Sequence, residues 1–355
     1  MRRLFSTGRA AGILGREQWS RQRAFFSSSL LFDDTQKQFK ESVSQFAQEN
    51  IAPHAAKIDA TNHFPKDVNL WKLMGGFNLH GVTVPEEYGG LGLGYLYHCI
   101  AIEEISRASG SVGLSYGAHS NPCINQLVRH GTAKQKYLPK VVYAKTDTSA
   151  GSKGITAFII EKGMPGFHTA PKLDKLGMRG SDTCELVFDK CFVPEENVLG
   201  QEGKGVYVMM PGFDFERLVL AAGPLGLQAC LDAVIPYVQH REQFGRAIRE
   251  FQWMLERIVI IFVGHLCILL LEIVTTETLT ERTVLELYFW LPKKLHKLPF
   301  IFCATTQAIQ CLGGNGYVDE YPTGRRLRYA KFFEISAGTS EIRRMIIGRE
   351  LFKQE

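Results

Sequence analysis

Residues 141–193 read VVYAKTDTSAGSKGITAFIIEKGMPGFHTAPKLDKLGMRGSDTCELVFDKCFV, and this stretch decides the fold class. Short runs rich in β-branched and aromatic residues alternate in it with the glycine-containing turns GSKG, GMPG and GMRGSD. Such runs predict antiparallel strands joined by tight turns. Helical patterns lie on both sides of the stretch. The chain is therefore predicted to be mainly α with a small middle β domain.

The flanking helical patterns define the domain organisation. Before the β stretch, helical patterns occur over 33–50, 65–77, 95–107, 121–131 and 132–138. After Gly205 the helical pattern returns. The predicted C-terminal helices are 207–210, 216–236 and 341–352. We expect an N-terminal α domain over 31–140, a middle β domain over 141–200 and a C-terminal helical bundle over 201–355.

The first 30 residues have the composition of a targeting segment. They contain six arginines, no lysine and a single acidic residue, Glu17, and they are rich in serine. This composition is typical of a mitochondrial transit peptide and lacks the apolar centre of a secretory signal. The alternative is a disordered basic tail. We therefore predict a protein of the mitochondrial matrix with residues 1–30 as its transit peptide.

Charge and cysteine content exclude several function classes. The chain has 355 residues and a formal net charge of +5, but six of its arginines lie in the leader, so the remainder is close to neutral. No nucleic-acid-binding surface is therefore predicted. The eight cysteines form no CxxC pair. This pattern indicates a reduced compartment, with neither a metal site nor a disulfide framework.

The most apolar run of the chain is 258–274, IVIIFVGHLCILLLEIV. It has 14 uncharged residues before Glu272, whereas a membrane span needs about 20. We therefore predict no membrane span. The run is apolar on all sides, which makes it a poor bundle helix that should promote association. No helix or strand pattern follows it up to residue 302.

Two glycine clusters raise the question of nucleotide binding. The cluster Gly89–Gly94 precedes a helix, as in a dinucleotide-binding loop, but no pair of its glycines has the third glycine that GxGxxG requires. A plain glycine-rich loop is the better interpretation. The second cluster is LGGNGY over 312–317. It fits either a simple helix end or a main chain without side chains that another molecule or segment can approach closely.

Eight stretches together resemble the acyl-CoA dehydrogenase family. The resemblance implies a fold of an α domain, a β domain and a C-terminal four-helix bundle, with FAD as cofactor and usually a homotetramer. It also implies electron-transfer flavoprotein as the partner that receives the electrons. The stretches are VPEEYGGLGLG (84–94), GITAFIIEKGMPGF (154–167), KLGMRGSDTCEL (175–186), GKGVYVMM (203–210), FERLVLAAGPLGL (215–227), HREQFGRAI (240–248), QAIQCLGGNGY (307–317) and AGTSEIRRMIIGR (337–349).

The resemblance also implies a reaction. In this family a glutamate removes the α-proton of an acyl-CoA thioester while the flavin takes a hydride from the β-carbon. Many members carry that glutamate where this chain has Ala337-Gly338, whereas members that oxidise isovaleryl-CoA in leucine breakdown carry it at the position of Glu216. Two small residues at 337 and 338 leave volume for a branched acyl tail. A long-chain member that places its base similarly is the alternative enzyme.

The family's functional residues match this chain position by position. Glu216 is the implied catalytic base, although the residue taken alone reads as an exposed helical charge beside Arg217. The residues matching acyl-CoA contacts are Ser152, Lys153, Tyr207, Asp214, Phe215, Arg217, Ala337 and Gly338. Those matching FAD contacts are Arg241, which meets the pyrophosphate from a neighbouring subunit, Gln252, Gln310, Cys311, Leu312, Gly313, Gly314, Thr339, Ser340 and Glu341.

Three departures from the family pattern point to a second hypothesis. Between residues 138–141 and 142–145 the chain steps from the end of the α domain into the middle of the β domain, without the family's first β strands. Residues 253–305 do not resemble the family, and Tyr329 replaces the usual aspartate after an arginine. These departures favour, as the alternative to an enzyme, a non-catalytic variant with a truncated β domain and an incomplete flavin site.

Overall fold

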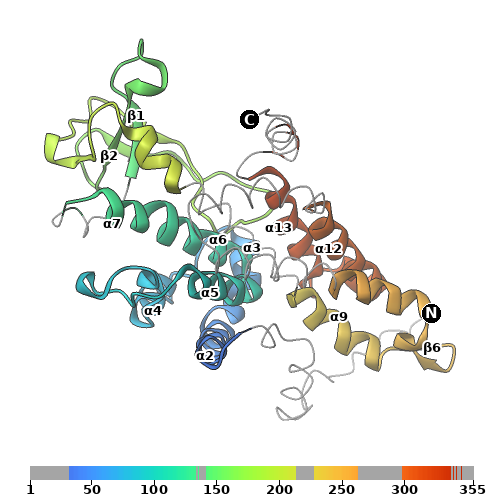
Figure 1. Ribbon diagram of the computed structural model, residues 1–355. Helices are drawn as coiled ribbons and strands as arrows, with labels where there is room; N and C mark the ends of the chain where they lie inside the picture. Colours follow the sequence, from blue (N-terminus) through green and yellow to red (C-terminus); the bar gives the residue numbers. More distant parts are fainter. Residues whose placement is uncertain are drawn as a thin grey trace, which may run out of the picture.

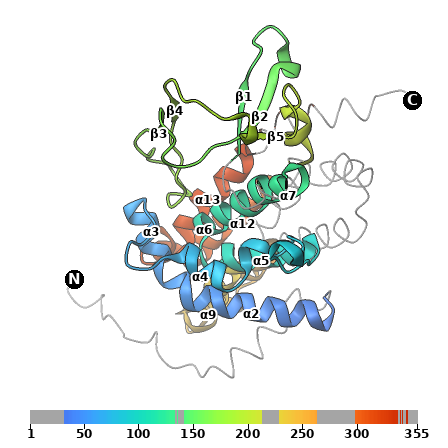
Figure 2. The ribbon, with the colours of Figure 1, turned by 90° about the vertical axis from the view of Figure 1, so that its left-hand side faces the viewer.

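The computed structural model describes residues 32–132, 135, 141–212, 228–262, 298–336, 339, 341 and 345. Helices make up most of these residues, and a small β region lies at one end of the molecule (Figure 1). Turned by 90°, the strands lie above the helices, and α2 lies at the opposite side (Figure 2). The predicted class, mainly α with a small β part, is confirmed. The predicted transit peptide, 1–30, lies outside the described residues.

The N-terminal region is a set of helices around one apolar core. The first long helix, α2, begins after Asp33, whose carboxylate accepts from the Gln36 N–H at 2.8 Å while the Gln36 side chain accepts from the Asp33 N–H. Its buried face packs against α5. The elements are α2 (Asp34–Asn50), η2 (Ala52–His54), α3 (Ala55–Thr61), α4 (Leu70–Gly76), η3 (Leu79–Gly81), η4 (Glu86–Tyr88), α5 (Tyr95–Ala108), α6 (Gly110–Ala118), the π-helix η5 (His119–Asn125) and α7 (Gln126–His130).

One predicted N-terminal helix begins later than its pattern suggested. The apolar spacing predicted a helix over 65–77, but α4 starts only at Leu70. The Asn69 side chain accepts from the Lys72 N–H at 3.0 Å and so caps the helix at that point. The local side-chain bond therefore overrides the longer apolar pattern.

The β region is antiparallel throughout its described part. Strands β1 (Val141–Lys145), β2 (Ile155–Ile159) and β5 (Val198–Leu199) form a sheet in the order β1-β2-β5, in which Val141 pairs with Ile159. Strands β3 (Phe167–Thr169) and β4 (Leu186–Phe188) form a separate ribbon. The predicted antiparallel strands are confirmed. The strand pairs of the described residues include no parallel pair, so they show no dinucleotide-binding sheet beside the Gly89–Gly94 loop.

The C-terminal region is helical again. Residues 205–212 are helical, and α9, α12 and α13 pack together beside a small hairpin (Figure 1). The sequence placed a helix end at Pro236, but α9 continues to His240. The cost of a proline inside the helix is offset by the packing of α9 along α12. The elements are α9 (Gln228–His240), β6 (Glu242–Gln243), β7 (Arg246–Ala247), η10 (Ile248–Glu250), α12 (Leu298–Leu312), η11 (Gly313–Tyr317) and α13 (Thr323–Ile335).

The structure describes only the start of the apolar run 258–274. Residues 252–262 are helical, Ile261 is fully buried in the main core, and Val259 is 55% exposed. The expectation of a helix that cannot pack is therefore wrong for 258–262, because one side of this turn is covered by the core. No helix of the described ranges is long and apolar enough to cross a membrane.

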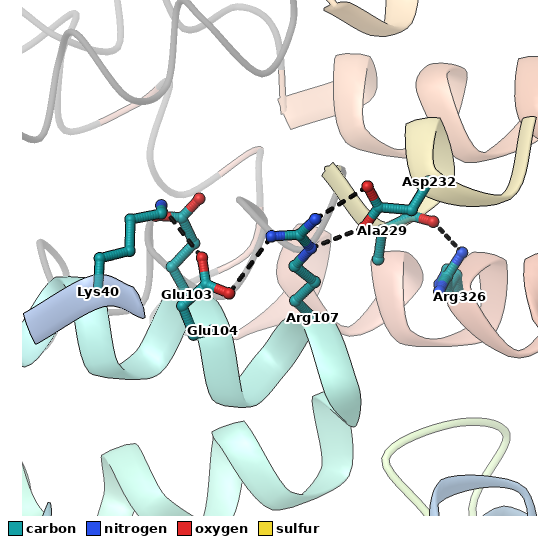
Figure 3. A network of polar contacts seen from close by, with 7 residues as sticks. All are labelled: Lys40, Glu103, Glu104, Arg107, Ala229, Asp232 and Arg326. Atoms are coloured by element: carbon teal, nitrogen blue, oxygen red, sulfur yellow. Dashed lines mark hydrogen bonds and ion pairs between the residues drawn. The ribbon is translucent and has the colours of Figure 1, made fainter. Parts of the chain in front are cut away.

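A chain of buried and partly buried charged side chains joins the N-terminal and C-terminal helices (Figure 3). The Lys40 ammonium of α2 lies 2.6 Å from Glu103 and 3.1 Å from Glu104 on α5. Arg107, one turn further along α5, lies 3.4 Å from Glu104 and makes two bonds of 2.6 and 2.9 Å to Asp232 of α9. The chain therefore fixes α2, α5 and α9 to one another.

The same chain of charges extends to the last described helix. Arg326 of α13 donates to the Ala229 carbonyl in the first turn of α9 (Figure 3). Burial lowers the pKa of Arg326. Burial alone would raise the pKa of Glu104, but Lys40 and Arg107 hold that pKa below its ordinary value. These opposing effects show that the carboxylate depends on its two cations to remain ionised.

We expect Arg107→Met to lower the free energy of unfolding by about 3 kcal/mol, because Glu104 and Asp232 lose their shared cation while remaining largely buried. Guanidinium denaturation measures this loss. The matched control is Lys37→Met, which breaks the exposed pair with Asp34 and should have a much smaller effect. Equal losses in the two variants would contradict the prediction.

A buried histidine should make stability depend on pH. His98 is 1% exposed, with Tyr116 Oη and Ser120 Oγ at 3.2 and 3.4 Å from its ring nitrogens, and burial lowers its pKa to about 4. The unfolded chain binds this proton near pH 6.5. The stabilisation is therefore complete above pH 6.5 and is lost as the pH falls towards 4, a change of about 3 kcal/mol.

The check is the free energy of unfolding at pH 7 and pH 4.5 for the wild type and for His98→Gln. The wild type should lose at least about 2 kcal/mol more than the variant over this interval, since glutamine does not titrate. The prediction fails if the two proteins show the same pH dependence.

Candidate functional site

Three of the predicted acyl-CoA contacts lie in one region beside the β sheet. Ser152 and Lys153 lie in the exposed turn η7 (Gly151–Gly154) between β1 and β2. A Cβ at Gly203 would lie 2.7 Å from the Lys153 carbonyl, so the turn touches the segment that enters helix 205–212. Tyr207 is 64% exposed on that helix. The structure therefore brings Ser152, Lys153 and Tyr207 into one neighbourhood.

A fourth residue of this region was missed by the sequence analysis. The Lys204 ammonium lies 5.1 Å from the centre of the Tyr207 ring. Together with Lys153 it supplies positive charge that suits the phosphates of coenzyme A. The lysine between two glycines at 203–205, directly before the helix, was the signal that could have indicated it.

The predicted base and its neighbours lie outside the described residues. Helix 205–212 is described up to Gly212, and Asp214, Phe215, Glu216 and Arg217 follow in the sequence. In the same way α13 is described to Ile335, and Ala337 and Gly338 come two residues later. The assignments of these six residues therefore stay predictions.

The predicted FAD contacts at the end of α9 form a second region. The Arg241 N–H donates to the Tyr237 carbonyl at 2.9 Å, and its carbonyl accepts from the Ile248 N–H at 2.8 Å, while its side chain is exposed. The Asn315 amide donates to the Tyr237 hydroxyl at 3.2 Å and so holds the glycine turn η11 beside the end of α9. Arg241 and the glycine turn are therefore anchored to the same residue.

The glycine turn leaves its main chain accessible. Gly313 has a φ of 58°, which favours glycine, and a Cβ built at Gly313 or Gly314 would meet nothing within 4 Å. At Gly316, by contrast, a Cβ would lie 2.3 Å from the Ile309 carbonyl. The cluster therefore both ends α12 and presents bare backbone, so the two interpretations left open by the sequence are compatible.

The remaining predicted FAD contacts differ in their exposure. Gln252 and Gln310 are exposed, whereas Cys311 and Leu312 are each 2% exposed, so only their main chain can meet a ligand. Burial raises the pKa of the Cys311 thiol to about 11. Thr339 and Glu341 are exposed, and Ser340 lies outside the described residues.

The structure does not bring the two regions together within one chain. The β1–β2 sheet and the end of α9 with β6 lie at opposite ends of the molecule in Figure 1, and β1 and β2 lie above α9 in Figure 2. The donor set at the α9 end nevertheless suits an anionic cofactor, since a guanidinium, exposed side-chain amides and bare backbone can bind a pyrophosphate. Over the described ranges no three His, Cys, Asp or Glu side chains form a metal-binding group.

Comparison with family models assigns the chain to a class. The N-terminal domain model of the acyl-CoA dehydrogenases matches residues 33–145, and the middle domain model matches 128–191. The C-terminal domain model matches 203–263 and 299–352 and skips the residues between them. The chain belongs to the acyl-CoA dehydrogenase family.

Individual relatives and solved structures resemble this chain over most of its length. Mitochondrial isovaleryl-CoA dehydrogenase from Oryza sativa is 60% identical over 408 aligned positions, which cover 97% of this chain and 98% of the relative. Mitochondrial 2-methylacyl-CoA dehydrogenase from Solanum tuberosum is 57% identical and 94% of each chain is covered. A solved chain described as electron transferring flavoprotein of Acidaminococcus fermentans has a TM-score of 0.81 at 29% identity, and the match covers 91% of this chain and 99% of that one.

Two points follow from these alignments. The Oryza and Solanum relatives are both named mitochondrial, which confirms the prediction of a mitochondrial protein. The alignment with the Oryza protein spans 408 positions while this chain has 355 residues, so that relative contains positions that this chain lacks.

Proposed function

We propose that this protein is an FAD-dependent acyl-CoA dehydrogenase that converts isovaleryl-CoA to 3-methylcrotonyl-CoA in leucine breakdown in the mitochondrial matrix. The observation that carries the proposal is the 60% identity to the Oryza isovaleryl-CoA dehydrogenase over nearly the whole chain. The Solanum relative named for 2-methylacyl-CoA supports a second short branched substrate as the alternative. Electron-transfer flavoprotein, the partner that the resemblance to the family implies, is the proposed acceptor of the electrons.

In this proposal Glu216 removes the α-proton of the thioester. A carboxylate with an ordinary pKa of about 4.3 is too weak a base, so the bound acyl chain must exclude water and raise that pKa. Ala337 and Gly338 leave room for the branched tail. The remaining acyl-CoA residues, Ser152, Lys153, Tyr207, Asp214, Phe215 and Arg217, hold the coenzyme A part and orient the α-carbon towards the base.

FAD supplies, when bound, the acceptor for the hydride of the β-carbon. The exposed Arg241 guanidinium suits the two anionic phosphates, because its planar fork donates two parallel bonds. Gly313 and Gly314 let the cofactor approach the main chain. We assign Gln252, Gln310, Thr339, Ser340 and Glu341 to the same cofactor. PigA, which shares the fold at 22% identity, is described as an FAD complex.

Exposed aromatic side chains near Arg241 support a homotetramer. Phe244 at the tip of the β6–β7 hairpin is 93% exposed, Trp253 is 77% exposed and Tyr317 of the glycine turn is 90% exposed. Large exposed aromatic side chains mark protein interfaces. A neighbouring subunit would cover them and would bring its own flavin to Arg241.

The middle domain supports the competing proposal of a non-catalytic variant. The sheet there has three described strands, and β1 stands at one edge of the order β1-β2-β5. Leu176 and Phe192 beside the β3–β4 ribbon are 67% and 79% exposed. A truncated β domain that leaves apolar side chains uncovered could fail to enclose a flavin.

The substrate assignment is tested with protein purified in the presence of FAD and assayed with an artificial electron acceptor. Isovaleryl-CoA should give a higher kcat/KM than straight-chain thioesters, since Ala337 and Gly338 admit a branched tail. A higher value for 2-methylbutyryl-CoA than for isovaleryl-CoA would support the 2-methylacyl alternative. A preference for a long straight chain would support the long-chain alternative.

The base assignment is tested in the same assay. Glu216→Gln should lower kcat by about 100-fold or more with little change in KM, because the amide keeps the shape and accepts no proton. The matched control is Glu202→Gln, at an exposed glutamate in the same part of the chain, which should leave kcat unchanged. Equal activity of Glu216→Gln and the wild type would remove Glu216 as the base.

The cofactor assignment is tested by flavin absorbance of the purified chain and by FAD titration. A yellow protein with one flavin per chain supports the enzyme, whereas a colourless protein supports the non-catalytic variant. Arg241→Ala should weaken FAD binding about 10-fold or more, because a charged hydrogen bond contributes about 1.5–3 kcal/mol. The exposed Arg249→Ala, eight residues further on, is the control and should leave FAD binding unchanged.

A further inference from the structure

Gln126 bridges two main-chain groups of the helix that carries Tyr207. It is the first residue of α7 and is 1% exposed. In the amide orientation that gives both side-chain atoms a partner, its Nε2 donates to the Val208 carbonyl at 2.8 Å and its Oε1 accepts from the Gly212 N–H at 3.1 Å. One buried side chain from the N-terminal region therefore holds the last described turn of helix 205–212.

The sequence of this turn explains why an outside side chain is needed. Pro211 has no N–H, so the helix lacks a main-chain donor at that position. A Cβ at Gly212 would lie 2.1 Å from the amide atom of Gln126 that faces it, which is Oε1 in this orientation, so a side chain there would displace the amide. The pair Pro211-Gly212 thus weakens the helix and leaves the space that the amide of Gln126 occupies.

Neighbouring polar side chains reinforce the same turn. The Arg129 guanidinium donates to the Pro211 carbonyl at 3.5 Å and to the Tyr95 hydroxyl at 2.8 Å. Asn125 also donates to the Tyr95 hydroxyl, at 3.1 Å. Leu127 and Val208 pack in the same apolar cluster as strands β2 and β5. The start of α7 is therefore fixed to both α5 and the sheet, and can act as a rigid support.

The π-helix before α7 turns amide side chains inward. Residues His119–Asn125 form this segment, with Pro122 inside it, and Asn121 and Asn125 are 1% and 4% exposed. Single π-helical turns inside helices occur frequently at functional sites. Here the π-helix ends at Asn125, directly before Gln126. The irregular segment and the buried amide that holds helix 205–212 are therefore consecutive in the chain.

We propose that Gln126 is a positioning residue for acyl-CoA oxidation, and this rests on the function proposed above. It holds the helix that presents Tyr207, and Glu216 follows only four residues after Gly212 in the sequence. Gln126 acts through that helix and makes no contact with substrate. Displacements of about 1 Å in reacting groups can lower rates about 100-fold.

The first test compares two buried glutamines that both bond to the main chain. Gln126→Leu removes the bridge to helix 205–212. The control, Gln135→Leu, removes bonds of 2.7 and 2.9 Å to the Glu196 and Val198 carbonyls, away from that helix, and Gln135 is 6% exposed. Both variants should lose stability. Only Gln126→Leu should lower kcat for isovaleryl-CoA, by about 100-fold, with a smaller change in KM.

Hydrogen exchange in the full-length chain gives a readout that does not need activity. Amides of the segment 205–217 should exchange faster in Gln126→Leu than in the wild type and should be unchanged in Gln135→Leu. If the wild type does not oxidise isovaleryl-CoA, the proposed function is wrong. The hydrogen-exchange comparison still decides whether Gln126 holds helix 205–212. Unchanged exchange in Gln126→Leu overturns the positioning role.

A double-mutant cycle checks that the contact with Gly212 is the relevant one. Gly212→Ala should accelerate exchange in 205–217, because its methyl group collides with the Gln126 amide. In Gln126→Ala/Gly212→Ala the collision is absent, so the two effects should not add.

If Gln126→Leu does not fold, Gln126→Glu replaces it, since a carboxylate accepts from Gly212 but cannot donate to Val208. Simple additivity in the cycle contradicts the proposal.

Discussion

The partly buried ion pair between Arg107 and Asp232 is the interaction on which the arrangement of the helices depends. It joins α5 to α9, and the chain of charges continues to Lys40 on α2 and to Arg326 on α13 (Figure 3). A charge removed from water is tolerated only where its partner is in place. A shift of α9 against α5 would leave charges buried without partners, so these contacts favour one packing of the N-terminal and C-terminal helices.

This packing also sets where ligand-binding groups can lie. The turn with Lys153 lies between β1 and β2 and touches the segment that leads to Tyr207, while Arg241 follows α9 and the glycine turn η11 is bonded to the end of α9 through Tyr237. In Figure 1 the β1–β2 sheet and β6, just after α9, lie at opposite ends of the molecule. The residues matched to acyl-CoA contacts and those matched to FAD contacts at the end of α9 therefore lie at different ends of the molecule. The aromatic side chains exposed beside Arg241 suit contact with a second subunit, which would complete each site in the assembly.

Sequence patterns predicted the local elements where neighbouring residues decide the outcome. The apolar spacing over 33–50 gave α2, and the β-branched runs after residue 141 gave antiparallel strands. The pattern over 65–77 extended too far, because Asn69 caps α4 at a later residue. The interpretation of 258–262 as a helix that cannot pack was wrong, because only the folded core shows which side of Ile261 is covered.

The sequence by itself determined the family, the order of helical and β regions, and the residues matching a base, an acyl-CoA site and an FAD site. These follow from motifs and periodicity, which residues within a few positions of one another carry. Only the tertiary structure decided that Arg107 pairs with Asp232, 125 residues away, and that the Gln126 amide bridges Val208 and Gly212. Such contacts depend on which surfaces of distant helices meet, and that choice is made by the burial and pairing of the whole core.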